Sequence, residues 1–169
     1  MVIIKKSDFI LRPLRISDSK AYWEAMQDEE TKKALMATPN SFKEAKIEVQ
    51  EKIEKAKTKV SETFTIEIDE KFAGTVTIEY QNYDVLSDEG RVHLVIHPNF
   101  RGKGLATKAL TALVEYAFNE RKFKILYGQT KVSNIAIAKV FEKVGFNLEK
   151  IHTVEGIKKH WWSLRRQVQ

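Results

Sequence analysis

The chain has 169 residues, of which 43% are hydrophobic and 31% charged, with a net charge of +6 and no cysteine. This length allows one domain with a substantial core, and the missing cysteines exclude disulfides, thiolate metal sites and a cysteine nucleophile. We expect a cytoplasmic protein, because no secretory leader and no apolar run long enough to cross a bilayer are evident.

The positive net charge is compatible with two classes of partner. One is nucleic acid, and the other is a polyanionic small ligand held on a mildly basic surface. Between residues 43 and 59 the lysines alternate with glutamates, a pattern more typical of a solvated helix face than of a DNA-binding strip. Charge alone leaves both classes open.

The first half of the chain predicts a strand, two helices and a hairpin. Residues 9–14 indicate a strand, and residues 20–27 a helix that Ser17 or Asp18 could cap. Ser41 and Glu44 have the spacing of a capping box for the second helix. The apolar stripe of this helix consists of Phe42, Ala45, Val49, Ile53, Ala56 and Val60. Alternation then predicts strands at residues 64–68 and 75–80, joined by a turn over residues 69–74.

The second half alternates strands and helices. A strand over residues 91–96 is stopped by Pro98, and a helix follows over residues 105–119. Ser133 or Asn134 caps a later helix. The remaining expected elements are a strand at 124–130, the capped helix to about 144 with Gly145 ending it, and strands at 147–151 and 160–166. This order predicts a single mixed α/β domain over residues 1–169, with its core at about 9–168.

The stretch NFRGKGLATKAL, residues 99–110, places two glycines between a strand and a helix. A P-loop would need a longer glycine spacing, and a dinucleotide fingerprint would need a third glycine where Thr107 stands. Small residues at Gly102, Gly104 and Ala106 would leave backbone N–H groups uncovered at a helix N-terminus, whose dipole favours an anion. A tight turn that only needs positive φ is the alternative at this point.

Two motifs carry a family resemblance. VIHPNFRGKGLAT, residues 95–107, resembles the acyl-CoA signature of the GNAT superfamily of N-acetyltransferases. SNIAIAKVFEKVGF, residues 133–146, resembles the asparagine-capped helix of that family. The N-terminal stretch FILRPLRISDSKAYWEAMQDEETKKAL is similar to the Rim-type branch, the ribosomal-protein N-terminal acetyltransferases, which also includes enzymes for polyamines, amino acids and antibiotics.

The resemblance implies a fold and a reaction. The fold is the α/β acyl-CoA N-acyltransferase fold, with a mixed, mostly antiparallel, splayed sheet flanked by about four helices. The reaction is direct transfer of an acetyl group from acetyl-CoA to a primary amine, either a protein or peptide α-amine or a small-molecule amine. The expected partners are acetyl-CoA and the amine, with no metal, no membrane and no nucleic acid, in a monomer or homodimer.

The resemblance also assigns residues. The pantetheine arm would meet Val95 and Ile96, and the amides of the glycine turn would cradle the diphosphate. The full cofactor-binding set is Val95, Ile96, Arg101, Gly102, Lys103, Gly104, Leu105, Ala106, Thr107, Asn134, Ala138, Phe141 and Lys143. The backbone N–H of Ile96 is the expected oxyanion donor. Glu79 is the candidate base, with Glu67 and His93 as further possibilities.

The chain departs from the family pattern at catalytic positions. Phe141 stands where many relatives have a tyrosine thought to protonate the leaving thiolate, Ile137 replaces a serine, and Arg91 replaces a glutamate. A thiol of pKa about 8.5 leaves readily without an acid. Deprotonating a lysine near pH 7.5 costs roughly 4 kcal/mol, against well under about 1 kcal/mol for an α-amine, so we expect a low-pKa amine as acceptor.

The acceptor is expected over the first two helices and the segment EYQNYDVLSDEG, residues 79–90. Its acids, Glu79, Asp84, Asp88 and Glu89, could attract a cationic amine, or could belong to a solvated loop. Two other functions stay open at this stage. One is a GNAT-like domain that binds acyl-CoA as a sensor without catalysis, and the other is nucleic-acid binding, which rests on charge alone.

Overall fold

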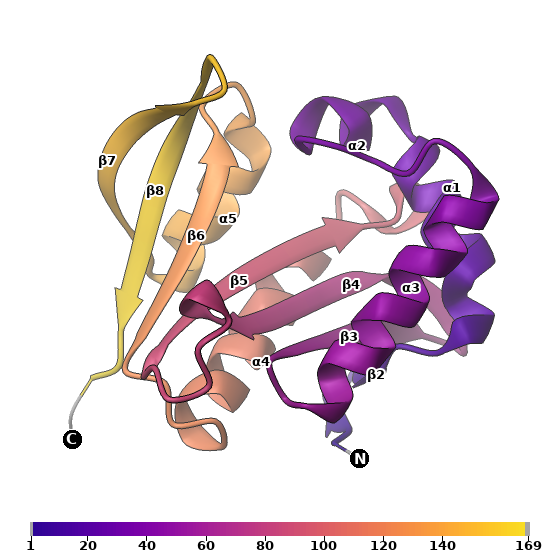
Figure 1. The fold of residues 1–169 in the computed structure, drawn as a ribbon, viewed down its shortest axis with the longest axis horizontal. Coiled ribbons are helices and arrows are strands. Elements are labelled where there is room, and N and C mark those ends of the chain that lie inside the picture. The colour runs from indigo at the N-terminus through magenta and orange to yellow at the C-terminus, as the bar shows by residue number, and fades with distance from the viewer. Residues whose placement is uncertain (1, 168–169) are drawn as a thin grey trace.

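One sheet of eight strands organises the molecule in the computed structural model, which describes residues 2–167 (Figure 1). Its order is β1-β2-β3-β4-β5-β6-β8-β7, and β5 and β6 form its parallel pair. The strands are β1 (Ile4–Lys5), β2 (Ile10–Pro13), β3 (Ser61–Ile68), β4 (Lys71–Tyr80), β5 (Glu89–Ile96), β6 (Ile125–Lys131), β7 (Asn147–Val154) and β8 (Ile157–Arg165).

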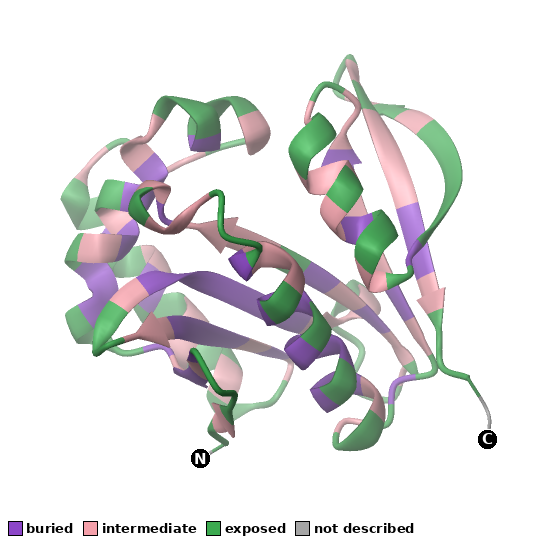
Figure 2. Cartoon of the chain, turned by 180° about the vertical axis from the view of Figure 1, so that it is seen from behind, coloured by how far each residue is buried: buried purple, intermediate pink, exposed green. Residues whose placement is uncertain are grey.

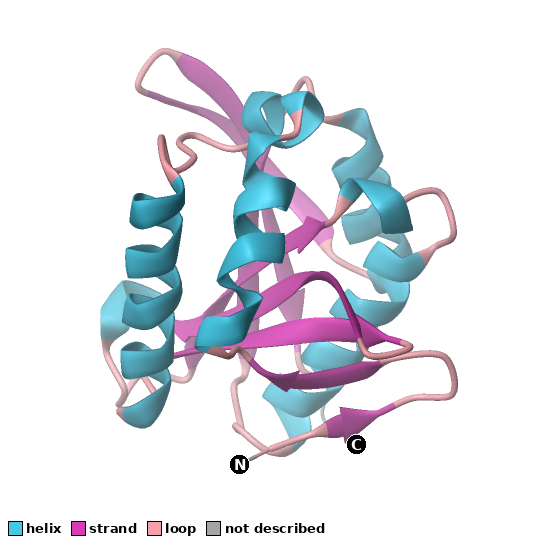
Figure 3. Ribbon diagram, turned by 90° about the vertical axis from the view of Figure 1, so that its right-hand side faces the viewer, coloured by secondary structure: helices cyan, strands magenta, loops and turns pink. Residues whose placement is uncertain are grey.

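Helices cover both faces of this sheet, as Figure 3 shows from the side. They are α1 (Ser19–Gln27), α2 (Glu29–Ala34), α3 (Phe42–Lys57), α4 (Leu105–Asn119) and α5 (Ile135–Val144). The expected mixed, mostly antiparallel sheet is confirmed. Five helices lie within residues 2–167 instead of about four, because the six-residue α2 is too short to show a helical period. The ends of the expected single domain, residues 1, 168 and 169, lie outside the described residues.

The predicted turn between β3 and β4 is too long. Only Asp69 and Glu70 lie in the turn, with φ of 48° and 62°, so the hairpin closes through two left-handed residues. Residues 71–74 belong to β4, where the register shifts opposite Ile66 and Glu67. Gly74 has φ +151°, and a Cβ there would collide with the carbonyl oxygen of Val95 on β5. A bulge that only glycine fits therefore explains why this segment resembled a turn.

The main core lies between the sheet and the α4–α5 face, and a smaller cluster lies under α1 and α3 (Figure 2). The N-cap of α3 is confirmed, since the Ser41 hydroxyl accepts from the N–H of Glu44 (3.1 Å). Ala45 and Val49 of the α3 stripe are fully buried, but Phe42 is 46% exposed, so the stripe meets the sheet only from Ala45 onward. None of the helices in residues 2–167 combines the length and apolar character needed to cross a membrane.

The sheet opens between β5 and β6. Their parallel ladder joins Glu89, Gly90 and Arg91 to residues 125–127 and ends there. Beyond it, β5 runs on to Ile96 beside β4, while β6 runs on to Lys131 beside β8. Figure 1 shows the two strands diverging, with α2 and the β7–β8 hairpin on opposite sides of the opening. The unpaired edge of β5 leads directly into the glycine turn.

Candidate functional site

The glycine turn forms an open cradle of backbone donors. Gly102 and Gly104 have φ of +79° and +73°, and nothing lies within 4 Å of a Cβ built on either. Gly104 is the N-cap of α4, and the first backbone bond into the helix runs from Lys108 N–H to Gly104 O (3.2 Å). The N–H groups of residues 105–107 therefore have no acceptor within the helix. They point outward at the positive end of the α4 dipole, a geometry that fits a phosphate.

Arg101 and Lys108, two of the cations near this cradle, form ion pairs with other parts of the chain. The Arg101 guanidinium pairs with Asp28 and Glu30, both at 2.9 Å. Lys108 pairs with Asp8. Lys103 is exposed and forms no ion pair with residues 2–167. Arg101 thus anchors the turn to α2. Its guanidinium is therefore not free to bind an anion, although the resemblance had placed Arg101 in the cofactor-binding set.

Backbone alternation decides which groups of β5 face the opening. His97 N–H donates to Ala73 O on β4 (2.9 Å), so every second residue of β5 bonds to β4. Val95 belongs to this set, and its side chain packs under α1 and α3. The N–H groups of Leu94 and Ile96 point the other way, toward the diverging β6. The N–H of Ile96, the predicted oxyanion donor, therefore faces the opening, whereas the backbone N–H of Val95 bonds to β4. The N–H of Leu94 also faces the opening, and the same alternation could have identified it from the sequence.

The start of α5 borders the opening from the other side. Asn134 Oδ1 accepts from Ile137 N–H (3.2 Å), so of the two predicted caps, Ser133 and Asn134, it is Asn134 that caps α5, and its amide NH₂ stays available as a donor. Ala138 is half-buried one turn further along the same face. Lys143 is exposed in the last turn, about 13 Å along the axis from Asn134. The contacts predicted on α5 are therefore spread over its whole length.

Phe141 lies in the core. Its side chain is 3% exposed and contacts Phe146 and Trp162, with ring centroids 4.8 and 5.8 Å away. Gly128 on β6 leaves room for this ring, since a Cβ there would collide with it. The structure thus places Phe141 beneath the surface, where it supports α5 against β6 and offers no proton.

Glu79 and His93 meet on the α3 side of β4 and β5. The His93 Nε2 lies 2.9 Å from Glu79 Oε1, and the side chains are 51% and 12% exposed. Burial raises the pKa of Glu79, but the His93 hydrogen bond and the nearby charges of Arg91 and Lys52 lower it further, so the pKa lies below its ordinary value. Burial lowers the pKa of Lys52 on α3. The neighbouring side chains therefore favour the ionised form of Glu79.

Residues 79–90, where the acceptor is expected from the sequence, border an aromatic pair on β6 and β8. Tyr127 packs against Trp161 with centroids 5.3 Å apart, and its hydroxyl lies 3.4 Å from Glu89 Oε1. Burial and the Glu89 charge raise the pKa of Tyr127. Of the four acids expected here, Asp88 is bound to Lys124 (2.7 Å) and Asp84 to the N–H of Leu86 (2.9 Å).

One side chain connects the two sides of the opening. Lys131 Nζ, at the end of β6, donates to the carbonyl oxygens of Lys33 and Leu35, both at 2.7 Å. These carbonyls lie at the C-terminal end of α2, where a cation is favoured. Lys131 therefore holds α2 toward β6.

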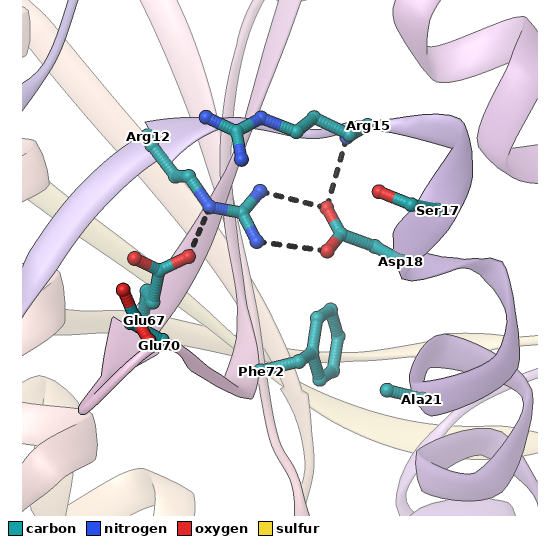
Figure 4. A pocket seen from close by; sticks show the side chains of 8 residues that line it. All are labelled: Arg12, Arg15, Ser17, Asp18, Ala21, Glu67, Glu70 and Phe72. Atoms are coloured by element: carbon teal, nitrogen blue, oxygen red, sulfur yellow. Dashed lines mark hydrogen bonds and ion pairs between the residues drawn. The ribbon is translucent and has the colours of Figure 1, made fainter.

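A separate pocket of about 420 Å³ lies between β2, β3 and the start of α1 (Figure 4). Arg12 donates to both oxygens of Asp18 (2.8 Å each) and to Glu67. Asp18 occupies the N-cap position of α1 without bonding its N–H groups. Glu67, a possible base by sequence, is thus bound to Arg12 away from β5. Within residues 2–167, no three His, Asp or Glu side chains are grouped to hold a metal.

Comparisons with known proteins agree with this arrangement. The family model described as Acetyltransferase (GNAT) domain matches residues 8–147. Spermidine N(1)-acetyltransferase of Escherichia coli (strain K12) is 29% identical over 86 residues, 51% of this chain and 45% of that relative, so the match spans less than half the length of the curated relative.

Solved structures match along nearly the whole chain. A GNAT acetyltransferase from Bacillus anthracis has a TM-score of 0.85 at 17% identity, covering 97% of this chain and 98% of that one. An acetyltransferase from Salmonella typhimurium that modifies the N-terminal serine of ribosomal protein L7/L12 has a TM-score of 0.86 at 16% identity, covering 98% and 100%. RimL in complex with coenzyme A has a TM-score of 0.85 at 16% identity, covering 97% and 98%. At these identities the matches establish the fold.

Proposed function

The chain belongs to the GNAT acetyltransferase family, and from that premise we propose that it transfers an acetyl group from acetyl-CoA to a primary amine. The observation that carries the proposal is the uncovered glycine turn at the start of α4, directly after the unpaired edge of β5. Acetyl-CoA supplies an acetyl thioester that an amine can attack. The residues described above supply binding, orientation and charge stabilisation.

The proposed cofactor site combines three elements. The N–H groups of residues 102–107 hold the diphosphate, with Lys103 as the available cation. The β5 edge at Leu94 and Ile96 pairs with the pantetheine arm, and one of these N–H groups stabilises the oxyanion that develops on the acetyl carbonyl. Asn134 and Ala138 of α5 contact the arm from the other side. Phe141 contributes from beneath, by fixing α5.

We propose an α-amine as the acceptor. The named relatives suggest two classes, a polyamine such as spermidine and a protein N-terminus such as that of L7/L12. Phe141 offers no proton and the Glu79 carboxylate has a lowered pKa, so neither of these two residues supplies the strong acid or base that a lysine-like amine needs. An α-amine, with a pKa of about 7.7–8.0, is roughly a quarter to two-fifths neutral at pH 7.5. A cytoplasmic location, the absence of a nucleic-acid partner and a monomeric or homodimeric state stay predictions.

The test is release of free coenzyme A thiol from acetyl-CoA with a panel of amines. The panel contains a peptide with a free N-terminus, the same peptide N-acetylated with a lysine side chain, and spermidine. We expect the free α-amine to give the highest kcat/KM. Tight coenzyme A binding without thiol release from any amine would contradict the proposal and favour an acyl-CoA sensor.

A further inference from the structure

His93 and Glu79 form a titratable pair at the opening, and the inference drawn from this pair rests on the proposed acetyl transfer. His93 lies on β5 directly before Leu94, whose N–H faces the opening. Its side chain is half-exposed on the acceptor face, whereas the Glu79 carboxylate beneath it is 12% exposed. Figure 1 shows α3 in front of β3 and β4, with β5 next to the opening. Of the pair, His93 is the group that an incoming amine can reach.

The pairing defines which imidazole nitrogen can accept a proton. Glu79 has a lowered pKa and is ionised at neutral pH, so its oxygen can only accept a hydrogen bond. Nε2 of His93, 2.9 Å away, must therefore carry the hydrogen. In the neutral ring the lone pair then resides on Nδ1, which has no hydrogen-bond partner among residues 2–167. This is the arrangement in which a carboxylate orients an imidazole for proton acceptance.

The position of the ring suits the reaction. Successive residues of a strand are about 3.3 Å apart, and side chains stand perpendicular to the in-plane N–H groups. The His93 ring thus stands over the acceptor face beside the edge where the Leu94 N–H points toward the acetyl carbonyl. An amine attacking from that face comes within direct or one-water reach of Nδ1.

From this geometry we infer that His93 is the general base of the acetyl transfer and that Glu79 is its positioning residue. His93 Nδ1 takes a proton from the bound ammonium and leaves a free amine. The amine nitrogen attacks the acetyl carbon, so that a C–N bond forms while the C–S bond breaks and the electron pair stays on sulfur. The nitrogen loses its second proton to the departing thiolate, and the proton on His93 leaves to solvent.

Charged and titratable groups of the neighbouring elements lie around this pair, and Arg91 and Lys52 act on Glu79 directly. Arg91 is two residues along the same face of β5, and Tyr127 and Glu89 lie at the β5–β6 junction. From α3, Lys52 acts on Glu79, and Glu48 accepts from Tyr22 of α1 (2.9 Å). The His93–Glu79 pair therefore has both positively and negatively charged side chains nearby. The test uses pH as its variable, because pH sets the fraction of the amine that still needs a base.

The experiment compares the wild type with His93→Gln, using a peptide α-amine as acceptor. At pH 7 the α-amine is mostly protonated and a base is needed, and at pH 9 it is already neutral. We expect kcat/KM of His93→Gln to fall about tenfold at pH 7, where only roughly a tenth of the α-amine is neutral, and less than about twofold at pH 9. In His93→Ala, added imidazole should restore part of the rate at pH 7.

Further variants separate catalysis from structure. Glu79→Gln should lower kcat at pH 7 with little change in KM for acetyl-CoA. Glu115→Gln, an exposed carboxylate on α4 bound to Lys6, is the matched control with wild-type rates. A loss in His93→Gln that is equal at both pH values, or no loss, would overturn the inference while leaving acetyl transfer intact. A wild type that binds coenzyme A but releases no thiol would overturn the proposed function itself, and this inference with it.

Discussion

Gly104 combines a left-handed backbone with open space above it. At φ +73°, any L side chain costs about 1–2 kcal/mol, and a Cβ would stand in the cradle of N–H groups. Gly156, in the β7–β8 turn, has φ +77° and equally open surroundings, but it lies outside the proposed cofactor site. A side chain would therefore strain the backbone about equally at both glycines, but only at Gly104 would it also lie within the proposed cofactor site.

We predict that Gly104→Ala and Gly156→Ala lose similar stability to urea, while only Gly104→Ala weakens coenzyme A binding. The expected increase in Kd is about tenfold, which corresponds to about 1.4 kcal/mol. Isothermal titration of both variants measures it. Equal Kd values for the two variants would show that the turn does not hold the phosphates.

Contacts between residues distant in sequence were the hardest to anticipate at this scale. The cap at Asn134 and the open turn at Gly104 follow from local residue types, and both were predicted. The pairing of Arg101 with Asp28 and Glu30 was not, because the partners are about seventy residues away in the chain and only the fold brings α2 to the turn. The pairing of Glu79 with His93 could have been suspected, since strand alternation puts both on one face.

At the scale of elements, the Arg12–Asp18 pair holds three of them together. Arg12 is on β2, Asp18 begins α1, and Thr65 of β3 donates to the same carboxylate (2.8 Å). Burial raises the pKa of Asp18, but the hydrogen bonds from Arg12, the Arg15 N–H and Thr65 lower it further, so the net pKa is below the ordinary value. The stability that this pair contributes is thus present above the ordinary aspartate pKa, about 3.9, and is lost as pH falls through the lower folded value.

We therefore predict that Asp18→Asn destabilises the fold by about 3–5 kcal/mol at pH 7, because the buried guanidinium keeps only one carboxylate partner. The difference from the wild type should shrink as pH falls below about 4. Urea unfolding from pH 7 to pH 3 checks both statements. Asp8→Asn, which breaks a surface pair with Lys108, should change stability little. A difference for Asp18→Asn that is constant with pH would contradict the assignment.

The elements themselves were mostly predictable from period and punctuation. Long segments such as α3, α4 and β4 show a clear 3.6- or 2-residue period, whereas α2 and β1, with six and two residues, are too short to show one. The predicted turn at Asp69 and Glu70 was too long, because Gly74 resembled a turn residue. In the structure Gly74 lies in the bulge of β4. The divergence of β5 from β6 cannot be read from either strand alone, because it depends on the pairing of β6 with β8.

At the scale of the whole molecule, the opening divides the sheet into two parts. The β1–β5 part ends in the glycine turn of α4, and the β6–β8–β7 part carries α5 with Asn134. The direct strand pairing between the parts is the short ladder at residues 89–91, assisted by the Lys131 contacts with α2. A ligand that binds only the folded protein and contacts both parts raises the free energy of unfolding, because its binding depends on both parts being in place.

Coenzyme A at about 100 times its Kd should accordingly raise the free energy of unfolding by about 2.7 kcal/mol. Because coenzyme A is long enough to reach both segments, its binding should slow amide hydrogen exchange at residues 102–107 and at residues 134–138. Inorganic pyrophosphate, which can occupy only the turn, should slow exchange at residues 102–107 alone. Hydrogen exchange followed by mass spectrometry distinguishes the two patterns. Protection by coenzyme A that is confined to the turn would show that α5 takes no part in holding the cofactor, and would restrict the cofactor site to the β5–α4 side of the opening.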